Sequence, residues 1–145
     1  MKEIKGNLFD YPVICKTTNA VVKADGRLVM GKGIALQAKQ RFKDIDLYLG
    51  NQVDYYGNRC FVYRSVKDKY IISFPTKHHW RDNSTLELIE VSTISLVDIT
   101  NIYGFEKVYL PRVGCCNGKL DWKNVKPILE KHLDDRFIVV DYENK

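Results

Sequence analysis

Two glycine-containing segments have residue types that suit the binding of an anion. The first, residues 30–33, reads Met-Gly-Lys-Gly, and the second, residues 114–118, reads Gly-Cys-Cys-Asn-Gly. Each precedes an expected helix, whose N-terminus offers free amides and the positive end of a dipole, and glycines permit close approach to the backbone. Alone, the first segment is better explained as a tight loop that merely needs glycines. Together, the two segments favour a diphosphate over a single phosphate.

A third segment, residues 73–82, carries titratable and aromatic side chains after an expected strand. It reads Ser-Phe-Pro-Thr-Lys-His-His-Trp-Arg-Asp, and loops on a rigid sheet often carry functional groups. Lys77 could act as a nucleophile or a proton donor where burial or neighbouring cations lower its pKa. The plainer interpretation is a solvated lysine between surface histidines, with Trp80 covering the edge of the core.

The elements that must position these segments alternate along the chain. Runs of β-branched and aromatic residues predict strands at residues 3–5, 13–17, 59–66, 69–74, 107–111 and 136–142. Helical spacing and helix formers predict helices at residues 34–42, 86–102 and 121–132, and a short helical turn at residues 47–53. The alternation predicts an α/β fold with a mixed, mainly parallel sheet and helices on both faces. The polar pair Lys67 and Asp68 predicts a tight hairpin turn between two adjacent strands.

The helix at residues 86–102 is predicted from its ends. Ile, Val and Thr dominate it, and their β propensity argues against a helix. Ser84 and Glu87, however, have the spacing of a capping box, and Gly104 suits a C-terminal cap. Asp121 is likewise expected to cap the following helix. Because ligands bind beyond the carboxyl ends of strands in such sheets, the three segments are expected to meet there.

Length and composition limit the class of protein. With 145 residues, 45% of them hydrophobic, the chain can bury a core as one compact domain without disulfides or a metal. The formal charge of +5 suits an anionic partner, but it is also common in proteins that bind none.

The four cysteines favour a reduced setting. Their only close pair, Cys115 and Cys116, is adjacent in sequence, which is poor geometry for an ordinary disulfide. The chain has no Cys-x-x-Cys spacing for zinc, no apolar run typical of a signal peptide and no stretch long enough to span a bilayer. We therefore expect a soluble, cytoplasmic monomer with no metal, no cofactor and no membrane partner.

At these segments the sequence resembles the macrodomain family. Within that family it is most similar to the branch that contains the DarG-type antitoxins and the terminal ADP-ribose protein glycohydrolase. The resemblance spans nearly the whole chain. The most specific motif is a Thr-Lys pair followed by His-Trp-Arg at residues 76–81, which is similar to the DarG-type branch. The other motifs lie at residues 6–9, 18–19, 30–35, 111–115 and 120–122. The resemblance implies a single macrodomain over residues 1–145, a three-layer α/β/α sandwich around a mixed, mainly parallel central sheet.

The resemblance also implies a pocket for ADP-ribose. Asn7 stands where many family members carry an aspartate that reads the adenine amino group, and its amide oxygen can still accept that hydrogen bond. Lys77 matches the catalytic lysine of the branch, which would attack the anomeric carbon or assist departure of the linked group. Asn19 and residues 30–35 would border the distal ribose, and residues 114–118 would wrap the diphosphate. The implied binding residues are Asn7, Leu8, Asn19, Met30, Gly31, Lys32, Gly33, Ile34, Ala35, Thr76, Val113, Gly114, Cys115, Cys116, Asn117 and Gly118.

Three departures from the family pattern bear on the substrate. The glycohydrolase that acts on acidic side chains carries an aspartate where this chain has Gly118, whereas the DarG-type branch has glycine. This favours ADP-ribose on a DNA base, with thymine as the DarG-type substrate, over protein carboxylates. Lys16 replaces an asparagine common in the family, and residues 21–28 look like a longer first loop. The second domain usual in DarG-type antitoxins is not expected in this chain.

Taken together, these features predict an ADP-ribosyl glycohydrolase that removes ADP-ribose from a modified macromolecule. ADP-ribosylated DNA is the favoured substrate, with transient contact to DNA. Two alternatives stay open. One is a non-catalytic module that binds ADP-ribose, and the other is a hydrolase of small ADP-ribose derivatives such as O-acetyl-ADP-ribose or ADP-ribose 1''-phosphate.

Overall fold

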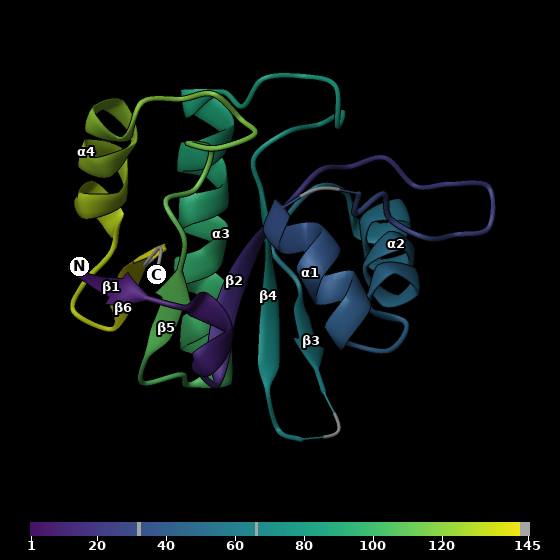
Figure 1. The fold of residues 1–145 in the computed structure, drawn as a ribbon, viewed down its shortest axis with the longest axis horizontal. Coiled ribbons are helices and arrows are strands. Elements are labelled where there is room, and N and C mark those ends of the chain that lie inside the picture. Colours follow the sequence, from purple (N-terminus) through teal and green to yellow (C-terminus); the bar gives the residue numbers. More distant parts are fainter. Residues whose placement is uncertain (32, 66, 143–145) are drawn as a thin grey trace.

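Six strands form one sheet in the computed structural model, which describes residues 1–31, 33–65 and 67–142. The strands are β1 (Lys2–Gly6), β2 (Val13–Thr18), β3 (Val62–Arg64), β4 (Tyr70–Pro75), β5 (Val108–Leu110) and β6 (Phe137–Tyr142). The helices are α1 (Gly33–Arg41), α2 (Ile45–Tyr56), α3 (Leu86–Tyr103) and α4 (Trp122–His132), with a short 3₁₀ helix η1 (Leu8–Asp10). The sheet order is β1-β6-β5-β2-β4-β3, and only the β3–β4 pair is antiparallel (Figure 1).

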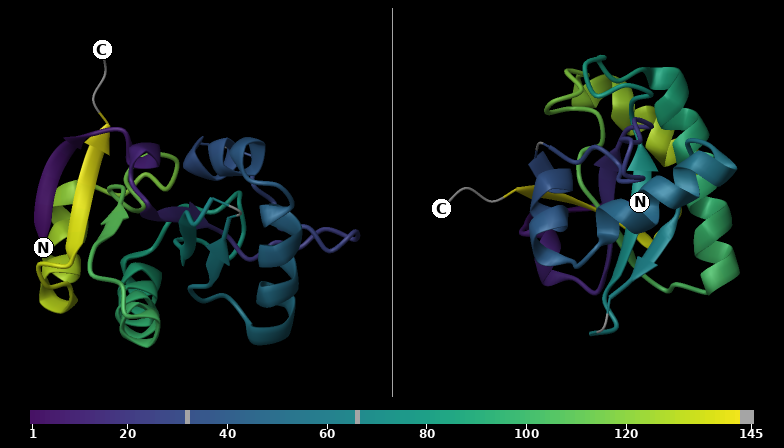
Figure 2. Two further views of the ribbon diagram at one scale, coloured as in Figure 1. Left: turned by 90° about the horizontal axis from the view of Figure 1, so that it is seen from below. Right: turned by 90° about the vertical axis from the view of Figure 1, so that its right-hand side faces the viewer.

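Helices cover both faces of the sheet, so the predicted three-layer α/β/α architecture is confirmed. In the left view of Figure 2, α3 and α4 lie on one side of the strands and α1 lies on the other. Each face has its own hydrophobic cluster. Ile89 and Leu129, from α3 and α4, are fully buried in the first cluster, and Ala38 and Leu49, from α1 and α2, are fully buried in the second. None of the helices in the described ranges is long and apolar enough to cross a membrane.

Two elements differ most in length from the predictions. The strand predicted at residues 59–66 is reduced to β3, because the amide of Cys60 donates to Ser95 Oγ of α3 and the amide of Phe61 donates to Ser73 Oγ. Val66 lies outside the described residues. The predicted helical turn at residues 47–53 is a helix of 12 residues, α2. The turn at Lys67 and Asp68 is confirmed, with Asp68 at φ 57° between antiparallel strands.

The capping box predicted for α3 is wrong by one residue. The N-cap is Thr85, whose Oγ1 accepts from the amide of Leu88 at 3.2 Å. Ser84 instead lies before the helix, with its hydroxyl buried and unpaired among the described residues. The C-terminal prediction is confirmed, because Gly104 adopts the left-handed conformation (φ 71°). Asp121 caps α4 as predicted, accepting from the amide of Lys123 at 3.1 Å.

The longer first loop is a narrow hairpin that projects past α2 (Figure 1). A bridge joins Val22 to Leu28, and Gly26 turns the chain at φ 87°. The hairpin rests on α2 at Gly50, where a Cβ atom would lie 2.0 Å from the carbonyl oxygen of Gly26. The returning arm of the hairpin, residues 26–28, therefore packs against the second helix.

Candidate functional site

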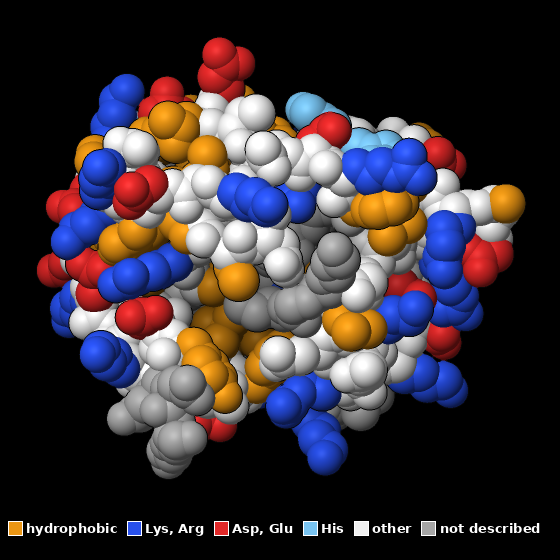
Figure 3. Space-filling model, turned by 45° about the horizontal axis from the view of Figure 1, so that its top comes forward, with side chains coloured by type: hydrophobic (Ala, Val, Ile, Leu, Met, Phe, Trp, Pro, Cys, Tyr) orange, Lys and Arg blue, Asp and Glu red, His pale blue; other side chains and the backbone are white. Residues whose placement is uncertain are grey.

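A cavity of about 1170 Å³ runs along the carboxyl ends of the five parallel strands. Its lining includes Asn7 after β1, Tyr142 at the end of β6, Arg112 after β5, Thr18 at the end of β2 and Thr76 after β4. Figure 3 shows the hollow from this edge, with Lys and Arg side chains around it. The cavity slightly exceeds the range of roughly 300–1000 Å³ typical of small-molecule sites, so it can hold an elongated ligand.

The second glycine segment lines the cavity and contains unpaired backbone amides. Gly114 has φ 76° and turns the chain, and its carbonyl accepts from the amide of Leu120 at 2.9 Å. Within the described part of the chain, the amides of Cys116, Asn117 and Gly118 have no hydrogen-bond acceptor. Successive free amides in such a loop form a nest for an anion. The segment therefore has the geometry expected of a phosphate cradle.

The first glycine segment is held in place by Asn19. The Asn19 amide nitrogen donates to the carbonyl of Val29 at 2.9 Å, and its oxygen accepts from the amide of Val21 at 2.8 Å. Met30 is buried, while Gly31 is exposed and lines the cavity. Asn19 thus lines the cavity and also closes the base of the loop.

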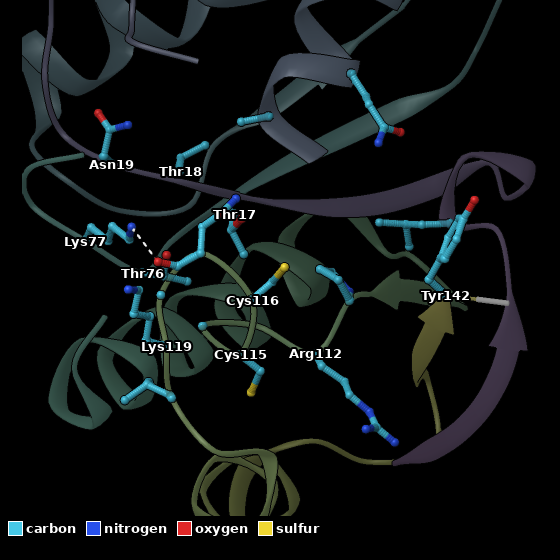
Figure 4. A pocket seen from close by; sticks show the side chains of 18 of the residues that line it. Thr17, Thr18, Asn19, Thr76, Lys77, Arg112, Cys115, Cys116, Lys119 and Tyr142 are labelled. Atoms are coloured by element: carbon cyan, nitrogen blue, oxygen red, sulfur yellow. Dashed lines mark hydrogen bonds between the residues drawn. The ribbon is translucent and has the colours of Figure 1, made fainter. Parts of the chain in front are cut away.

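Lys77 spans the gap between the third segment and the second. Its side chain is half-buried, and Nζ donates to the carbonyl oxygen of Asn117 at 3.2 Å (Figure 4). Its backbone is fixed, because Asn58 Nδ2 donates to the Lys77 carbonyl at 3.0 Å and the amide of Thr76 donates to Thr18 at 3.0 Å. The amine of Lys77 therefore stands next to the amide nest, on the side of the cavity formed by β4.

Ser84 packs directly behind the second glycine segment. Its amide donates to the carbonyl of Gly118 at 3.0 Å. A Cβ atom at Gly118 would lie 2.1 Å from Ser84 Oγ and 2.6 Å from the carbonyl oxygen of Gly114. Position 118 therefore has no space for a side chain in this loop conformation.

Most of the residues predicted for the site line one cavity. Thirteen of them do so: Asn7, Leu8, Asn19, Met30, Gly31, Ala35, Thr76, Lys77, Gly114, Cys115, Cys116, Asn117 and Gly118. Val113 does not, because its side chain is fully buried in the core beside α3 and α4. Lys32 lies outside the described residues, and of Gly33 and Ile34 only the backbone at the start of α1 is described.

Several lining residues were missed by the sequence predictions. Thr17, Arg112, Lys119 and Trp122 adjoin predicted segments, so extending each segment by a few residues would have found them. Tyr142 has no such signal, since only the pairing of β6 with β1 brings it beside Gly6. Trp80, expected to cover the core edge, lines the cavity and is 42% exposed.

Lys16 is a fully buried lysine beneath the first glycine segment. Its side chain is 0% exposed, and Nζ donates to the sulfur of Met30 at 3.5 Å, a weak acceptor. Burial lowers its pKa to about 7, although the charge of Asp46 acts in the opposite direction. Lys16 therefore destabilises the fold at every pH at which the unfolded lysine is protonated, and this cost is largest below pH 7, where the folded lysine is also protonated.

We expect Lys16→Met to stabilise the fold at neutral pH. The unfolded lysine titrates near 10.5, so wild-type stability should rise as the pH increases from about 7 to 10.5, and this group should leave stability unchanged below pH 7. The advantage of the variant should shrink by roughly 1.4 kcal/mol per pH unit across that window. Urea unfolding at pH 6, 7, 8 and 9 measures this, with exposed Lys39→Met as control. A pH-independent difference between Lys16→Met and wild type would contradict the assignment.

The fold and site together define a three-layer α/β/α protein with an anion-suited cleft at the carboxyl edge of its sheet. A model of the Macro domain family matches residues 21–129, and the chain belongs to the macrodomain family. It is 34% identical over 144 residues to the DNA ADP-ribosyl glycohydrolase of Thermus aquaticus, covering 92% of this chain and 38% of the relative. It is 36% identical over 112 residues to that of Mycobacterium tuberculosis, covering 68% of this chain and 30% of the relative.

The structural comparison agrees with the sequence comparison. The macrodomain of Mycobacterium tuberculosis DarG superposes with a TM-score of 0.83 at 30% identity, covering 99% of this chain and 97% of that one. The chain therefore matches 97% of that macrodomain, whereas it spans 38% and 30% of the two curated relatives.

Proposed function

We propose that the protein is an ADP-ribosyl glycohydrolase that removes ADP-ribose from a modified DNA base, with thymine favoured. The observation that carries the proposal is the 3.2 Å contact of Lys77 Nζ with Asn117, which sets an amine beside an amide nest in one elongated cavity. The names of the two DNA ADP-ribosyl glycohydrolases support the substrate class. The protein would act in the cytoplasm as a monomer that contacts DNA transiently.

The order of the strands gives the ligand a direction. Adenine would lie at the β1–β6 end near Asn7, the diphosphate over residues 114–118, and the distal ribose between Asn19 and Lys77. Asn7 Oδ1 already accepts from the amide of Phe9 at 3.0 Å. An amide oxygen has a second lone pair, which remains for the adenine amino group.

In this arrangement Lys77 would act on the anomeric carbon of the distal ribose. As a nucleophile, its unprotonated amine would form a C–N bond while the glycosidic bond breaks and the base leaves with its electron pair and takes a proton. Water would then hydrolyse the adduct, releasing ADP-ribose and restoring the amine. As a general acid, Lys77 would instead protonate the departing base while water attacks.

Gly118 supports a base over an acidic side chain as the acceptor. If the reaction needed a second carboxylate beside Lys77, that carboxylate would lie in the second glycine segment. A Cβ atom at residue 118 would, however, collide with Ser84. The carboxylates that line the cavity, Asp121 and Asp141, each contact a cation, Lys123 at 3.7 Å and Arg112 at 3.6 Å respectively.

The deciding experiment compares substrates in parallel. The protein is incubated with a thymidine oligonucleotide carrying ADP-ribose, an ADP-ribosyl-glutamate peptide, O-acetyl-ADP-ribose and ADP-ribose 1''-phosphate, and mass spectrometry follows free ADP-ribose. We expect release from the oligonucleotide. Binding without release from any substrate would support the non-catalytic module instead. Release only from the small compounds would support a metabolite hydrolase. Release only from the peptide would overturn the argument from Gly118.

Tyr142→Ala is expected to weaken ADP-ribose binding roughly tenfold. The ring is 72% exposed at the cavity end beside Gly6, where it can stack on the adenine. Isothermal titration calorimetry with ADP-ribose measures the change. Tyr55→Ala, which removes an 81% exposed ring from α2 outside the cavity, is the control and should bind as wild type does. Equal affinities for Tyr142→Ala and wild type would place adenine elsewhere.

A further inference from the structure

We propose that Trp80 forms the acceptor subsite, the surface against which the modified nucleobase stacks while Lys77 acts on the ribose. This inference rests on the proposed function and deepens it. Trp80 lines the cavity with 42% of its surface exposed, three residues after Lys77. An aromatic ring in that position meets whatever is attached to the anomeric carbon rather than ADP-ribose itself.

The order of the sheet places Trp80 at the acceptor end of the cavity. The cavity lining follows the carboxyl ends from β1 to β4, and Trp80 lies in the loop after β4. The one strand beyond, β3, runs antiparallel to β4, so the chain leaves it at the opposite edge of the sheet. With adenine at the β1–β6 end, the group linked to the distal ribose must leave the cavity past the Trp80 loop.

The Trp80 loop is fixed before any ligand arrives. The carbonyl of His78 accepts from the amide of Ala20 at 3.0 Å, and the His79 ring nitrogen Nδ1 accepts from the amide of Arg81 at 3.0 Å. The guanidinium of Arg81 lies 4.8 Å from the centre of the Trp80 ring, and the His79 ring centre lies 5.2 Å from it. A side chain held in this way loses little conformational freedom on binding, which favours affinity.

The chemistry around Trp80 favours a nucleobase on a phosphate chain over an acidic peptide side chain. Every base offers a flat face that stacks on indole, and the charges of Arg81, Lys77 and Lys119 suit the adjacent phosphates. Neither Lys77 nor Lys119 forms an ion pair with any residue in the described ranges. A glutamate side chain has no comparable flat surface for the ring to recognise.

Binding in an inactive background tests the subsite. In Lys77→Ala protein, fluorescence anisotropy measures the affinity for a single-stranded oligonucleotide with ADP-ribose on one thymine, and competition measures the affinity for free ADP-ribose. We expect the oligonucleotide to bind more tightly than ADP-ribose. Adding Trp80→Ala should weaken oligonucleotide binding roughly tenfold and change ADP-ribose binding less than twofold. Adding Trp80→Phe, which keeps a ring, should recover most of the loss.

Each other outcome overturns the subsite. Equal losses for both ligands would make Trp80 part of the ADP-ribose site or of the fold, and no loss for either would leave the ring without a role. Oligonucleotide and ADP-ribose of equal affinity would exclude an acceptor subsite, and an equal loss for an ADP-ribosyl-glutamate peptide would exclude recognition of the base. The proposed function is overturned by a different result, which is that protein with Lys77 intact releases no ADP-ribose. The two failures are therefore distinguishable.

Discussion

Lys77→Ala is expected to lower kcat for ADP-ribose release by roughly 10²- to 10⁴-fold, the range typical of losing a general acid–base or nucleophilic group. Binding of ADP-ribose should change little, because Nζ contacts the second glycine segment through one hydrogen bond to Asn117 and the amide nest does not depend on it. Single-turnover release and calorimetry, measured on the same preparation, separate the two effects.

Two further variants sharpen this test. Lys23→Ala removes an exposed lysine from the projecting hairpin and should retain wild-type turnover. Lys77→Arg keeps the positive charge but stays protonated, so it should be as inactive as Lys77→Ala if an unprotonated amine is required. Reduction with sodium cyanoborohydride during turnover should trap an ADP-ribosyl adduct on Lys77 if the amine is the nucleophile. Full activity in Lys77→Ala would exclude Lys77 from catalysis.

Gly118→Asp is expected to weaken ADP-ribose binding by more than tenfold and to lower stability by about 1–3 kcal/mol. The new Cβ atom would lie 2.1 Å from Ser84 Oγ, so the loop must move and the amides of Cys116 and Asn117 would lose their alignment. The added carboxylate would also repel the diphosphate. Calorimetry with ADP-ribose and thermal unfolding report the two losses.

Two control variants, one at Gly31 and one at residues 84 and 118, accompany Gly118→Asp. Gly31→Ala adds a Cβ atom that meets nothing within 4 Å, so its thermal unfolding should match that of wild type. Ser84→Gly combined with Gly118→Ala should be more stable than Gly118→Ala alone, because the hydroxyl responsible for the shortest contact is gone. Wild-type affinity in Gly118→Asp would show that the loop accepts a side chain without rearranging.

Local sequence signals were enough to predict the fold because capping residues indicate where the helices begin and end. Asp121 and Gly104 each cap a helix as their residue types require, and the alternation of strands and helices limits the sheet to a mainly parallel one. The errors arose where tertiary contacts replaced local ones. The amide of Cys60 bonds to Ser95 of α3 instead of a strand, and Ser84 packs on a glycine loop instead of capping a helix.

The sequence predicted those parts of the site that lie in contiguous motifs. Glycine loops and the Lys77 motif are contiguous in sequence, so their chemistry is visible there. Tyr142 and Trp80 line the cavity because the strand order brings the ends of β6 and β4 to it. No short segment of the sequence predicts that strand order. The buried position of Lys16 was equally hidden, since its neighbours on β2 include the polar Thr17 and Thr18.

The packing of Ser84 against Gly118 also limits how this site can change through evolution. A single substitution at residue 118 meets both Ser84 Oγ and the carbonyl oxygen of Gly114, so an ancestor with this loop could not gain a carboxylate there in one step. Residue 84 must become smaller first, or together with a shift of the loop. The two positions should therefore vary as a pair among homologous chains, with small or absent side chains at 84 wherever 118 is not glycine.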